Sequence, residues 1–379
     1  MAVNNRIFYA CQAVGLRKMG QATSVAPTIA HGVQSVGITT NFNLEQAFEL
    51  GQIQIYENIE GLPDVEVTLE KVLDGYPLLF HLATAGAEAA GLVGRSKARA
   101  DLHLGIFSDA NDSIGDDADG KPDVEVYCSG MYAGSVSYTI PIDGNATESL
   151  TLTGNNKEWQ VGSARIMDVP AGDGFGSDAP KAFTDISGGV QRRENVRLDW
   201  SYLPASIHGV NASSKGNGWN STTNSPLAHL QSISISTDFA RDDLLELGRK
   251  TPYFRAPGFP IEVTCEIECY AVSGDFISAY EEGDPTFFTT SSTSSGDNTS
   301  EEKIVISLQD STAFDLGTKN RLSSVSYGGG DATGGNVSLT YSYSNFNVLN
   351  VLHQQDPWLS AGVSDYSPAQ SGYMYQRGV

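Results

Sequence analysis

Three aspartates in one acidic stretch, Asp117, Asp119 and Asp123, have the types and spacing of metal ligands, and Gly120 lies between them. The arrangement is similar to the D-x-D-G-x-x-D part of a calcium loop, because calcium takes several oxygen ligands and glycine permits a sharp turn. Gly115 stands where the longer form of this pattern has another aspartate. Aspartate and glycine are also ordinary turn formers. The stretch therefore fits either a calcium site, the one cofactor that the sequence suggests, or an acidic turn.

Glutamates form a second acidic pattern in two short runs, VEVTLE at 65–70 and IEVTCEIE at 261–268. Side chains two residues apart share one face of a strand, so each run presents carboxylates and threonines on a single face. Paired carboxylates act as acid and base in glycoside hydrolases, whereas a polar row opposite an apolar one is typical of the solvent face of an antiparallel sheet. The residues of this face are Glu66, Thr68, Glu70, Glu262, Thr264, Glu266 and Glu268.

Motifs of common catalytic centres do not occur in the sequence. We find no H-E-x-x-H metal motif, no G-x-S-x-G elbow and no G-x-x-x-x-G-K phosphate loop. Cys265 and Cys269 share a strand face but lie about 13 Å apart in an extended chain, which is beyond the reach of a disulfide. They are typical of small buried hydrophobic residues. The sequence therefore predicts a protein that is not an enzyme.

The elements that position these residues occur twice. The segment QSVGITTNFNLEQAFELG at 34–51 aligns without a gap with QSISISTDFARDDLLELG at 231–248, at an offset of 197. Downstream one residue is dropped and VEVT at 65–68 aligns with IEVT at 261–264, and 134–149 is faintly similar to 323–338. The chain is therefore predicted to be an internal duplication, with one domain at 1–189 and a second at 190–379.

Apolar residues alternate with polar ones through most of both copies, which is the period of a strand. We predict an all-β fold of two tandem β-sandwich or barrel domains, with one or two short helices. The first helix is expected at 43–51, with Asn43 as its cap and Gly51 as its terminator. The second is expected at 76–86. Its apolar residues are Leu78, Leu79, Phe80 and Leu82, and they surround the helix, so it is either buried or docked on another surface.

The overall charge argues against a nucleic-acid binder. The 379 residues carry 23 Lys and Arg against 45 Asp and Glu, a formal net charge of −22. Tight DNA binding requires basic residues that neutralise phosphates, and here the balance is reversed. No apolar run approaches the roughly 18 residues of a membrane span, and the first 20 residues do not read as a signal peptide. We therefore expect synthesis in a cytoplasm.

Parts of the first copy resemble the tail tube proteins of long-tailed bacteriophages. The residues that carry the resemblance are QSVGITTNF at 34–42, LGQ at 50–52 and IEGLPDVEVTLE at 59–70, and the likeness is clearest over 32–82. In that family one sheet of a β-sandwich joins its neighbours into a continuous barrel around a lumen. Rings of such domains stack into a tube through which DNA passes.

This resemblance implies a structural virion protein of the tail, assembled in the cytoplasm of a bacterial host with other tail proteins as partners. It implies that the glutamates and threonines of the acidic strand face line the lumen, where DNA slides during ejection without tight binding. It also implies that Leu78, Leu79, Phe80 and Leu82 make contacts between rings. Because each chain carries two copies, three chains would supply the family's usual six domains, which predicts a homotrimeric, pseudo-sixfold ring.

Two other classes fit parts of the sequence. A β-sandwich that binds carbohydrate or decorates a capsid could use Trp200, Trp219 and Trp358 to stack on sugars. A hydrolase could use a glutamate pair such as Glu66 and Glu262, although nothing else in the chain organises a pocket around them. A monomer with affinity for glycans would favour the first of these readings, and self-assembly would favour the tube.

Overall fold

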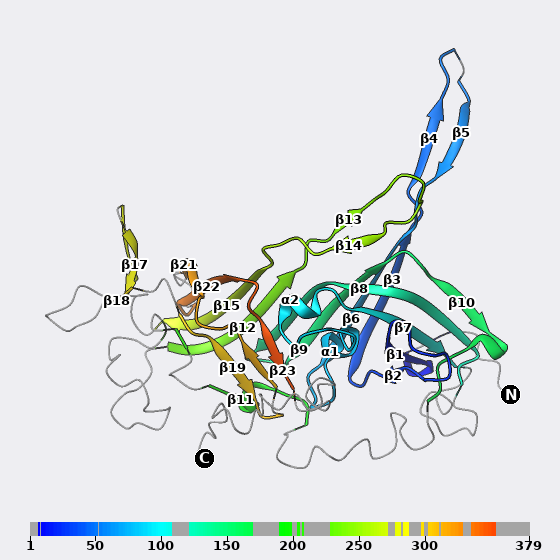
Figure 1. Ribbon diagram of the computed structural model, residues 1–379. Helices are drawn as coiled ribbons and strands as arrows, with labels where there is room; N and C mark the ends of the chain where they lie inside the picture. Colours follow the sequence, from blue (N-terminus) through cyan, green and yellow to red (C-terminus); the bar gives the residue numbers. More distant parts are fainter. Residues whose placement is uncertain are drawn as a thin grey trace, which may run out of the picture.

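The computed structural model describes residues 7, 9–51, 53–107, 121–169, 189–198, 203–204, 207, 228–271, 277–281, 283–287, 297–298, 302–310, 312–328 and 335–353. Strands dominate these residues, and the prediction of an all-β fold is confirmed (Figure 1). The helices are α1 (Leu79–Ala83) and α2 (Leu92–Arg95), with 3-10 turns η1 (Tyr9–Cys11), η2 (Gly162–Ala164) and η3 (Arg193–Asn195).

The strands of the first half are β1 (Gln12–Lys18), β2 (Thr28–Ile29), β3 (Val33–Asn41), β4 (Leu44–Phe48), β5 (Ile55–Glu60), β6 (Asp64–Val72), β7 (Arg99–Ile106), β8 (Val124–Pro141), β9 (Thr147–Gly154) and β10 (Glu158–Val161). Those of the second half are β11 (Val196–Arg197), β12 (Ala228–Asp238), β13 (Asp242–Leu244), β14 (Phe254–Ala256), β15 (Glu262–Ala271), β16 (Ile277–Tyr280), β17 (Gly283–Phe287), β18 (Asp297–Asn298), β19 (Val305–Leu308), β20 (Ala313–Asp315), β21 (Arg321–Gly328), β22 (Ser338–Phe346) and β23 (Asn350–Leu352).

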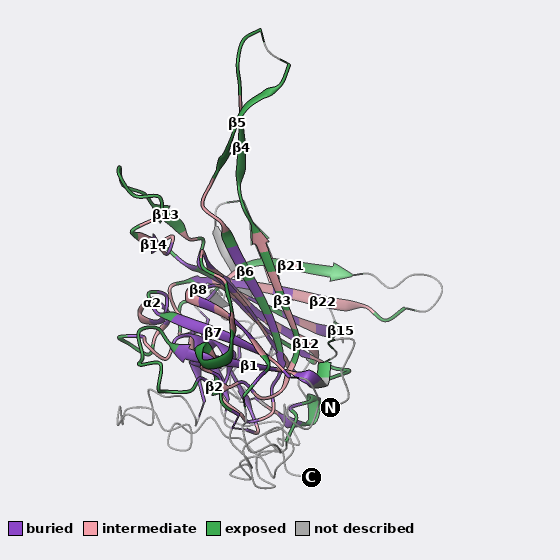
Figure 2. Ribbon diagram, turned by 90° about the vertical axis from the view of Figure 1, so that its right-hand side faces the viewer, coloured by how far each residue is buried: buried purple, intermediate pink, exposed green. Residues whose placement is uncertain are grey.

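One continuous antiparallel sheet runs through both halves. Its first four strands follow the order β3-β6-β9-β8 and its last four the order β12-β15-β22-β21, so that β8 and β12 join the halves side by side. The alternating apolar residues of β6, from Val65 to Leu69, are buried, while Glu66, Thr68 and Glu70 are exposed, and buried and exposed positions alternate along the strand (Figure 2). The sheet therefore has one core face and one polar face.

A second layer covers the core face in each half. In the first half the strand order is β2-β1-β7-β8, with β10 also paired to β8. The long strand β8 belongs to both layers, because its first part pairs with β7 and β10 and its last part with β9 and β12. In the second half the corresponding sheet has the order β11-β19-β20-β23.

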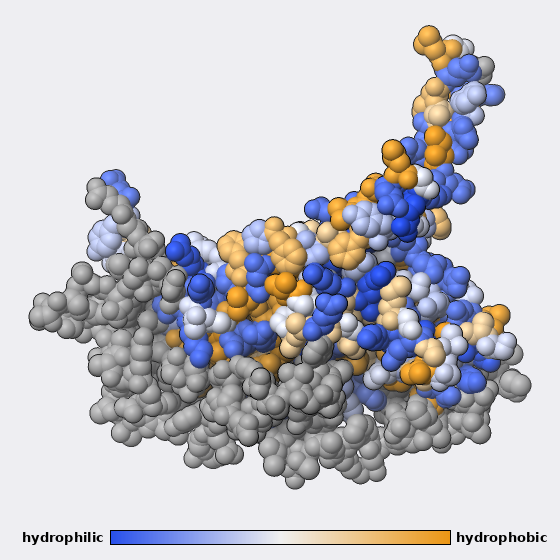
Figure 3. Space-filling view, viewed as in Figure 1, coloured by the Kyte–Doolittle hydropathy of each residue, from blue (hydrophilic) through white to orange (hydrophobic). Residues whose placement is uncertain are grey.

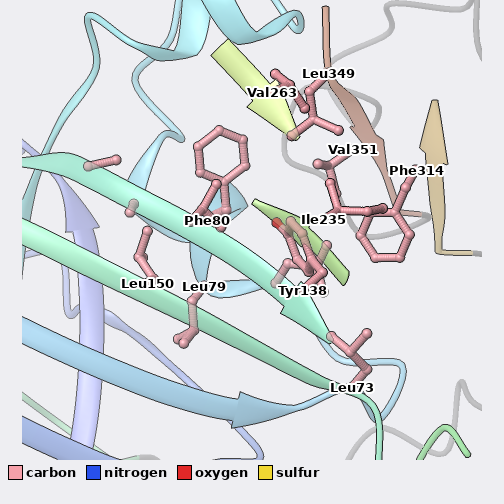
Figure 4. Packing of buried hydrophobic residues seen from close by; sticks show 14 of the residues in the cluster. Leu73, Leu79, Phe80, Tyr138, Leu150, Ile235, Val263, Phe314, Leu349 and Val351 are labelled. Atoms are coloured by element: carbon pink, nitrogen blue, oxygen red, sulfur yellow. The ribbon is translucent and has the colours of Figure 1, made fainter. Parts of the chain in front are cut away.

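The hydrophobic core is shared by the two halves. Tyr138 of β8 packs on Phe314 of β20 with ring centroids 4.5 Å apart (Figure 4). Phe80 of α1 stacks on Phe239 with ring centroids 6.3 Å apart. The buried residues of both halves form one contiguous cluster. Separating the halves would expose these rings to water, at a cost of about 25 cal/mol for each Å² of apolar surface.

Helix α1 lies within the helix predicted at 76–86 and is fixed by a buried carboxylate. Glu148 of β9 accepts hydrogen bonds from the backbone N–H groups of Leu79 (2.7 Å) and Phe80 (3.0 Å), and from the Tyr138 hydroxyl (3.0 Å). The carboxylate thereby satisfies N–H groups that have no partner within the helix. Burial raises the pKa of Glu148, and these hydrogen bonds oppose the shift.

The helix predicted at 43–51 is wrong. Residues 44–48 form strand β4, which pairs with β5 from Leu44↔Glu60 to Phe48↔Ile55. Asn43 has a positive φ of 48°, which turns the chain out of β3 and into the hairpin rather than into a helical turn. We call residues 42–61 the arm, because the hairpin projects away from both sheets (Figure 1).

A buried polar link connects the start of the second half to the first. The backbone N–H of Gln191 donates to the Leu73 carbonyl (2.7 Å), and its carbonyl accepts from Ala146 (2.8 Å). The Gln191 side chain accepts from the backbone N–H of Asp310 (3.4 Å), in the turn between β19 and β20. Burial raises the pKa of Asp310 to about 6; a hydrogen bond from Thr312 opposes this shift and the nearby Asp74 carboxylate adds to it.

Asp310→Asn should remove part of the pH dependence of stability. Because the pKa of Asp310 is raised in the folded state, its protonated form contributes to the stability of the fold. This contribution is fully present below the ordinary pKa of 3.8 and is lost as the pH rises through about 6. Between pH 4 and 7 this group should lower the free energy of unfolding by about 1–3 kcal/mol. Urea denaturation of both proteins at several pH values measures the difference. Equal slopes in the two proteins would contradict the assignment.

Candidate functional site

The strand pair that joins the two halves is the best-defined interface in the structure. Strand β12 pairs with β8 over seven positions, from Ser232↔Pro141 to Asp238↔Ser135. Beyond the last pair, the backbone N–H of Phe239 donates to the Gly134 carbonyl (2.9 Å). Tyr138 and Phe239 are both buried, with exposed fractions of 1% and 0%. We call this strand pair the junction.

The hairpin β13–β14 extends the junction beyond the paired strands. Arg241, just before β13, donates to the Ala133 carbonyl (2.7 Å) and the Ser96 carbonyl (2.6 Å), and its guanidinium lies 4.6 Å from the centroid of the Tyr132 ring. Burial lowers the pKa of Arg241 to about 10, while Tyr132 raises it and Arg255 lowers it further. The hairpin of the second half is therefore held against β8 of the first.

Strands β3 and β12 share their local geometry as well as their sequence. A bulge falls at Gln34 in β3 and at Gln231 in β12, and each glutamine donates from its side chain to the carbonyl two residues earlier (3.3 and 3.2 Å). The next residue, serine in both strands, donates to a glutamate of the paired strand, Glu70 or Glu268. An offset of 197 therefore places matching residues in matching structure.

The hairpins that follow these strands also correspond. Asn43 and Ala240 both have positive φ angles, of 48° and 40°. The pair Gln46↔Asn58 in the arm matches Asp243↔Arg255 in β13–β14 at the same offset. The arm is thus the first-half counterpart of the hairpin that leans on β8.

Strands β8 and β21 correspond in the same way. Both contain the sequence SVSY, at 135–138 and 324–327, and both have a bulge immediately before it, at Gly134 and Ser323. Each pairs on one side with the matching strand of its own half, β9 or β22. On its other side β8 is paired with β12 at the junction, whereas among the described strands β21 ends the sheet. Strand β3 ends the sheet at the opposite side.

The two free edges expose residues that their counterparts bury. Phe42, which follows β3, is 63% exposed, whereas the matching Phe239 is fully buried. Tyr327 of β21 is 57% exposed, whereas the matching Tyr138 of β8 is 1% exposed. Further large apolar side chains of the arm are exposed, as Figure 3 shows at the tip, among them Phe48, Leu50 and Ile53. Such a concentration of exposed apolar side chains marks an interaction site or an aggregation liability.

The polar face of the continuous sheet carries hydroxyl and carboxylate groups on its inner strands. From β6 to β22, hydroxyl and carboxylate residues occupy alternating positions of this face, and none of those positions carries a lysine or arginine. These residues are Glu66, Thr68 and Glu70 on β6; Ser149, Thr151 and Thr153 on β9; Ser135, Ser137 and Thr139 on β8; Ser232, Ser234, Ser236 and Asp238 on β12; Glu262, Thr264, Glu266 and Glu268 on β15; and Ser338, Thr340, Ser342 and Ser344 on β22.

All seven residues predicted for the acidic strand face lie on this polar face. The two runs correspond in a different register from the sequence alignment, however. Glu70 faces Ser35 and Glu268 faces Ser232, so Glu70 matches Glu268 rather than Glu266. The shift is two residues, which preserves the face of every side chain.

The structure contradicts the expected inter-ring contact at α1. The exposed fractions of Leu78, Leu79, Phe80 and Leu82 are 1%, 0%, 0% and 6%. These side chains pack in the core of their own chain, because α1 is attached to β9 through Glu148 and lies beneath the sheet. They stabilise the fold and present no surface to another ring.

Other predicted site residues fall partly outside the described residues. Of the candidate calcium ligands, Asp117 and Asp119 lie outside them, and Asp123 is exposed. Trp200, Trp219 and Trp358 also lie outside them. Across the part of the chain that the structure describes, no group of three or more His, Cys, Asp or Glu residues could hold a metal ion. Within the same part, no helix is long and apolar enough to cross a bilayer.

A buried histidine–glutamate hydrogen bond that the sequence did not reveal links β7 to β8 in the outer layer. His103 of β7 bonds through Nδ1 to Glu125 of β8. The other carboxylate oxygen of Glu125 accepts from the backbone N–H groups of Ile166 (2.7 Å) and Met167 (3.0 Å). Burial raises the pKa of Glu125. The hydrogen bonds from His103 and from the backbone N–H groups of Ile166 and Met167 together lower it by more, so the net shift is downward. The second carboxylate oxygen is thus held by backbone, and Nε2 of His103 is buried without a hydrogen-bond partner among the described residues, so we assign the pair a structural role.

No family model matches the chain, and no curated protein matches it. Among solved structures, it is similar to the tube-terminating cap of the anti-feeding prophage, with 15% identity over 43% of this chain and 95% of that one and a TM-score of 0.31. It is also similar to a chain of the PVC sheath-tube complex of an extracellular contractile injection system (13% identity, 42% and 95% covered, TM-score 0.30). A third likeness is to a chain of the PVC sheath/tube terminator (15% identity, 42% and 100% covered, TM-score 0.30).

Phe239→Ala and Phe42→Ala should have very different effects on the stability of the isolated chain, although the sequence repeat aligns these residues. Truncating buried Phe239 should lower the free energy of unfolding by about 3–5 kcal/mol. Truncating exposed Phe42 should change it by less than about 0.5 kcal/mol. Chemical denaturation at low protein concentration measures both values. A large loss for Phe42→Ala would show that this side chain is already packed within its own chain.

Proposed function

We propose that this chain is a structural protein of a bacteriophage tail, in which three copies close into a ring and the rings stack into a tube around a DNA-conducting lumen. The observation that carries the proposal is the junction. The chain already contains one complete copy of the contact between a β8-type strand and a β3-type strand. It also exposes the two halves of a second such contact, β21 and β3, at its opposite edges.

Unpaired sheet edges expose backbone donors and acceptors that readily pair with another chain. If β21 receives β3 of a second copy in the register of the junction, Thr39 faces Ser326, as Ser236 faces Ser137 within the chain. Ile38 then faces Tyr327, as Ile235 faces Tyr138. The exposed ring of Tyr327 would become covered as that of Tyr138 is.

A head-to-tail contact of this kind forms either a closed ring or an open filament. Each chain contributes eight strands to the continuous sheet. Closed barrels of roughly 16–18 strands already leave a water-filled channel, so three chains would enclose a lumen. We assign the polar face to the lumen, because the opposite face is covered by the second layer of each half.

The chemistry of the polar face suits the passage of DNA. Its carboxylates repel phosphates, and its inner strands offer no basic group that would hold the DNA backbone. Hydroxyl groups keep the surface wetted without adding positive charge. The seven residues from Glu66 to Glu268 predicted for this face would then line the lumen, and other tail proteins would contact the ends of the tube.

Cysteines at facing positions of the two free edges should cross-link neighbouring chains. In Thr39→Cys/Ser326→Cys, oxidation should produce covalent dimers and a covalent trimer as the largest closed species. The four native cysteines are buried and should not compete. Non-reducing electrophoresis and mass photometry measure the products.

Either single-cysteine variant serves as the control for this experiment, because one cysteine per chain cannot link a complete ring. A closed covalent hexamer would contradict the trimer. An absence of cross-linked products from the double variant, at concentrations where rings are visible by electron microscopy, would contradict the proposed register.

Reversing the charge of the polar face should create affinity for DNA. Glu66→Lys/Glu70→Lys/Glu262→Lys/Glu266→Lys changes the net charge of each chain by eight units on the face assigned to the lumen. Fluorescence anisotropy with a short duplex should show binding that weakens steeply with salt, since each neutralised phosphate contributes to the salt dependence. The wild-type protein should show no binding. Equal behaviour of the two proteins would place the polar face away from the path of DNA.

A further inference from the structure

The hairpin β13–β14 contacts the first half through specific side chains beyond the paired strands. Phe254 of β14 meets Tyr132 of β8 edge to face, with ring centroids 6.3 Å apart. Next to it, Arg255 forms an ion pair with Asp64 at the start of β6 (3.2 Å). These contacts attach the hairpin of one copy to the sheet of the other.

The correspondence between the two halves identifies the matching residues at the free edges. The arm residue that matches Phe254 is Glu57, by the offset that relates the two hairpins. The residue of β21 that matches Tyr132 is Arg321, since Tyr132 pairs with Thr153 and Arg321 with Ser344 at equivalent places before the bulge. An aromatic pair inside the chain therefore corresponds to an acidic and a basic residue at its two ends.

The second contact changes in a similarly complementary way. Asn58 of the arm matches Arg255, and Glu262 of β15 matches Asp64. The ion pair of Arg255 with Asp64 within the chain thus corresponds to an amide, Asn58, and a carboxylate, Glu262, at the two free ends of the sheet. The amide retains N–H donors that a carboxylate can accept.

The two charged residues are exposed and have free charges in the single chain. Glu57 and Arg321 are both exposed, and among the described residues neither takes part in a side-chain hydrogen bond or ion pair. The arm has no lysine or arginine anywhere between residues 41 and 64. By contrast, Arg321 is the first residue of β21, and a second exposed basic residue, Lys319, precedes it by two positions. An acidic arm and a basic strand end are electrostatically complementary.

We propose that the arm of one chain docks on the second half of the neighbouring chain, with Glu57 forming an ion pair with the partner subunit's Arg321 and Asn58 donating to the partner subunit's Glu262. The partner is a second copy of this chain, and the inference rests on the proposed ring. Pairing two β3 edges would instead bring two acidic arms together. The ion pair therefore favours head-to-tail closure over a symmetric dimer.

Charge reversal in each partner and in both tests the contact. Arg321→Glu and Glu57→Arg should each raise the concentration for half-maximal ring assembly about tenfold or more, because like charges then face each other. The double variant Glu57→Arg/Arg321→Glu should return to within about threefold of wild type, since the pair is restored in reverse. Mass photometry over a dilution series gives these concentrations. Arg193→Glu and Glu88→Arg change the net charge equally at exposed sites elsewhere and should assemble as wild type does.

The outcomes separate this inference from the proposed ring. Single reversals that assemble like wild type, while the Thr39–Ser326 cross-link still forms, would overturn the ion pair and retain the ring. Single reversals that block assembly without rescue in the double variant would also overturn it, because the charges would then act separately. A wild-type chain that forms neither rings nor cross-links would overturn both proposals.

Discussion

The need of edge strands for hydrogen-bond partners governs the architecture of this chain. A strand at the end of a sheet leaves one row of backbone N–H and C=O groups without protein partners, which invites uncontrolled association. Within the chain, β12 provides those partners for β8 and buries Tyr138 and Phe239 at the same time. At the ends of the sheet, β3 and β21 remain open. The chain thus contains one completed pair of edge strands, β8 with β12, together with two edge strands, β3 and β21, that still lack a partner.

The repeat is conserved most closely where the backbone requires it. Gln34 and Gln231 occupy the same bulge and make the same hydrogen bond, and the turn into each hairpin begins at a residue with positive φ. Outside this framework the copies differ in what they contact. Arg241 anchors one hairpin on β8, whereas the arm carries Leu44 at the matching position and projects into solvent. Similar backbone frameworks therefore present different side chains to different neighbours.

Alternation and the repeat predicted the strands and both polar runs from sequence alone, because each depends on a local period of two. The helix expected at 43–51 failed because the cap-like Asn43 also suits the base of a hairpin and the terminating Gly51 also suits its tip turn. Only the pairing of 44–48 with 55–60 distinguishes a hairpin from a helix here. The two-residue shift between the glutamate runs was hidden, since VEVT and IEVT align best by residue type whereas the ladder is set by the bulges. Burial of Phe80 depends on Glu148, which is 68 residues away in sequence, so no local pattern could place it.

In the proposed ring, two similar halves in one chain allow two different interfaces, which identical single domains could not provide. In a ring of identical subunits every interface must use the same side chains. Here the interface within the chain uses Tyr132 and Phe254, which suit permanent burial, whereas the matching positions at the ends carry Arg321 and Glu57. Exposed charges keep the free edges hydrated in the single chain, and in the proposed ring a charge pair would contribute more to partner choice than to affinity. In the proposed ring, the two copies would thus separate the interface that folds the chain from the interface that joins chains, and each could change independently of the other.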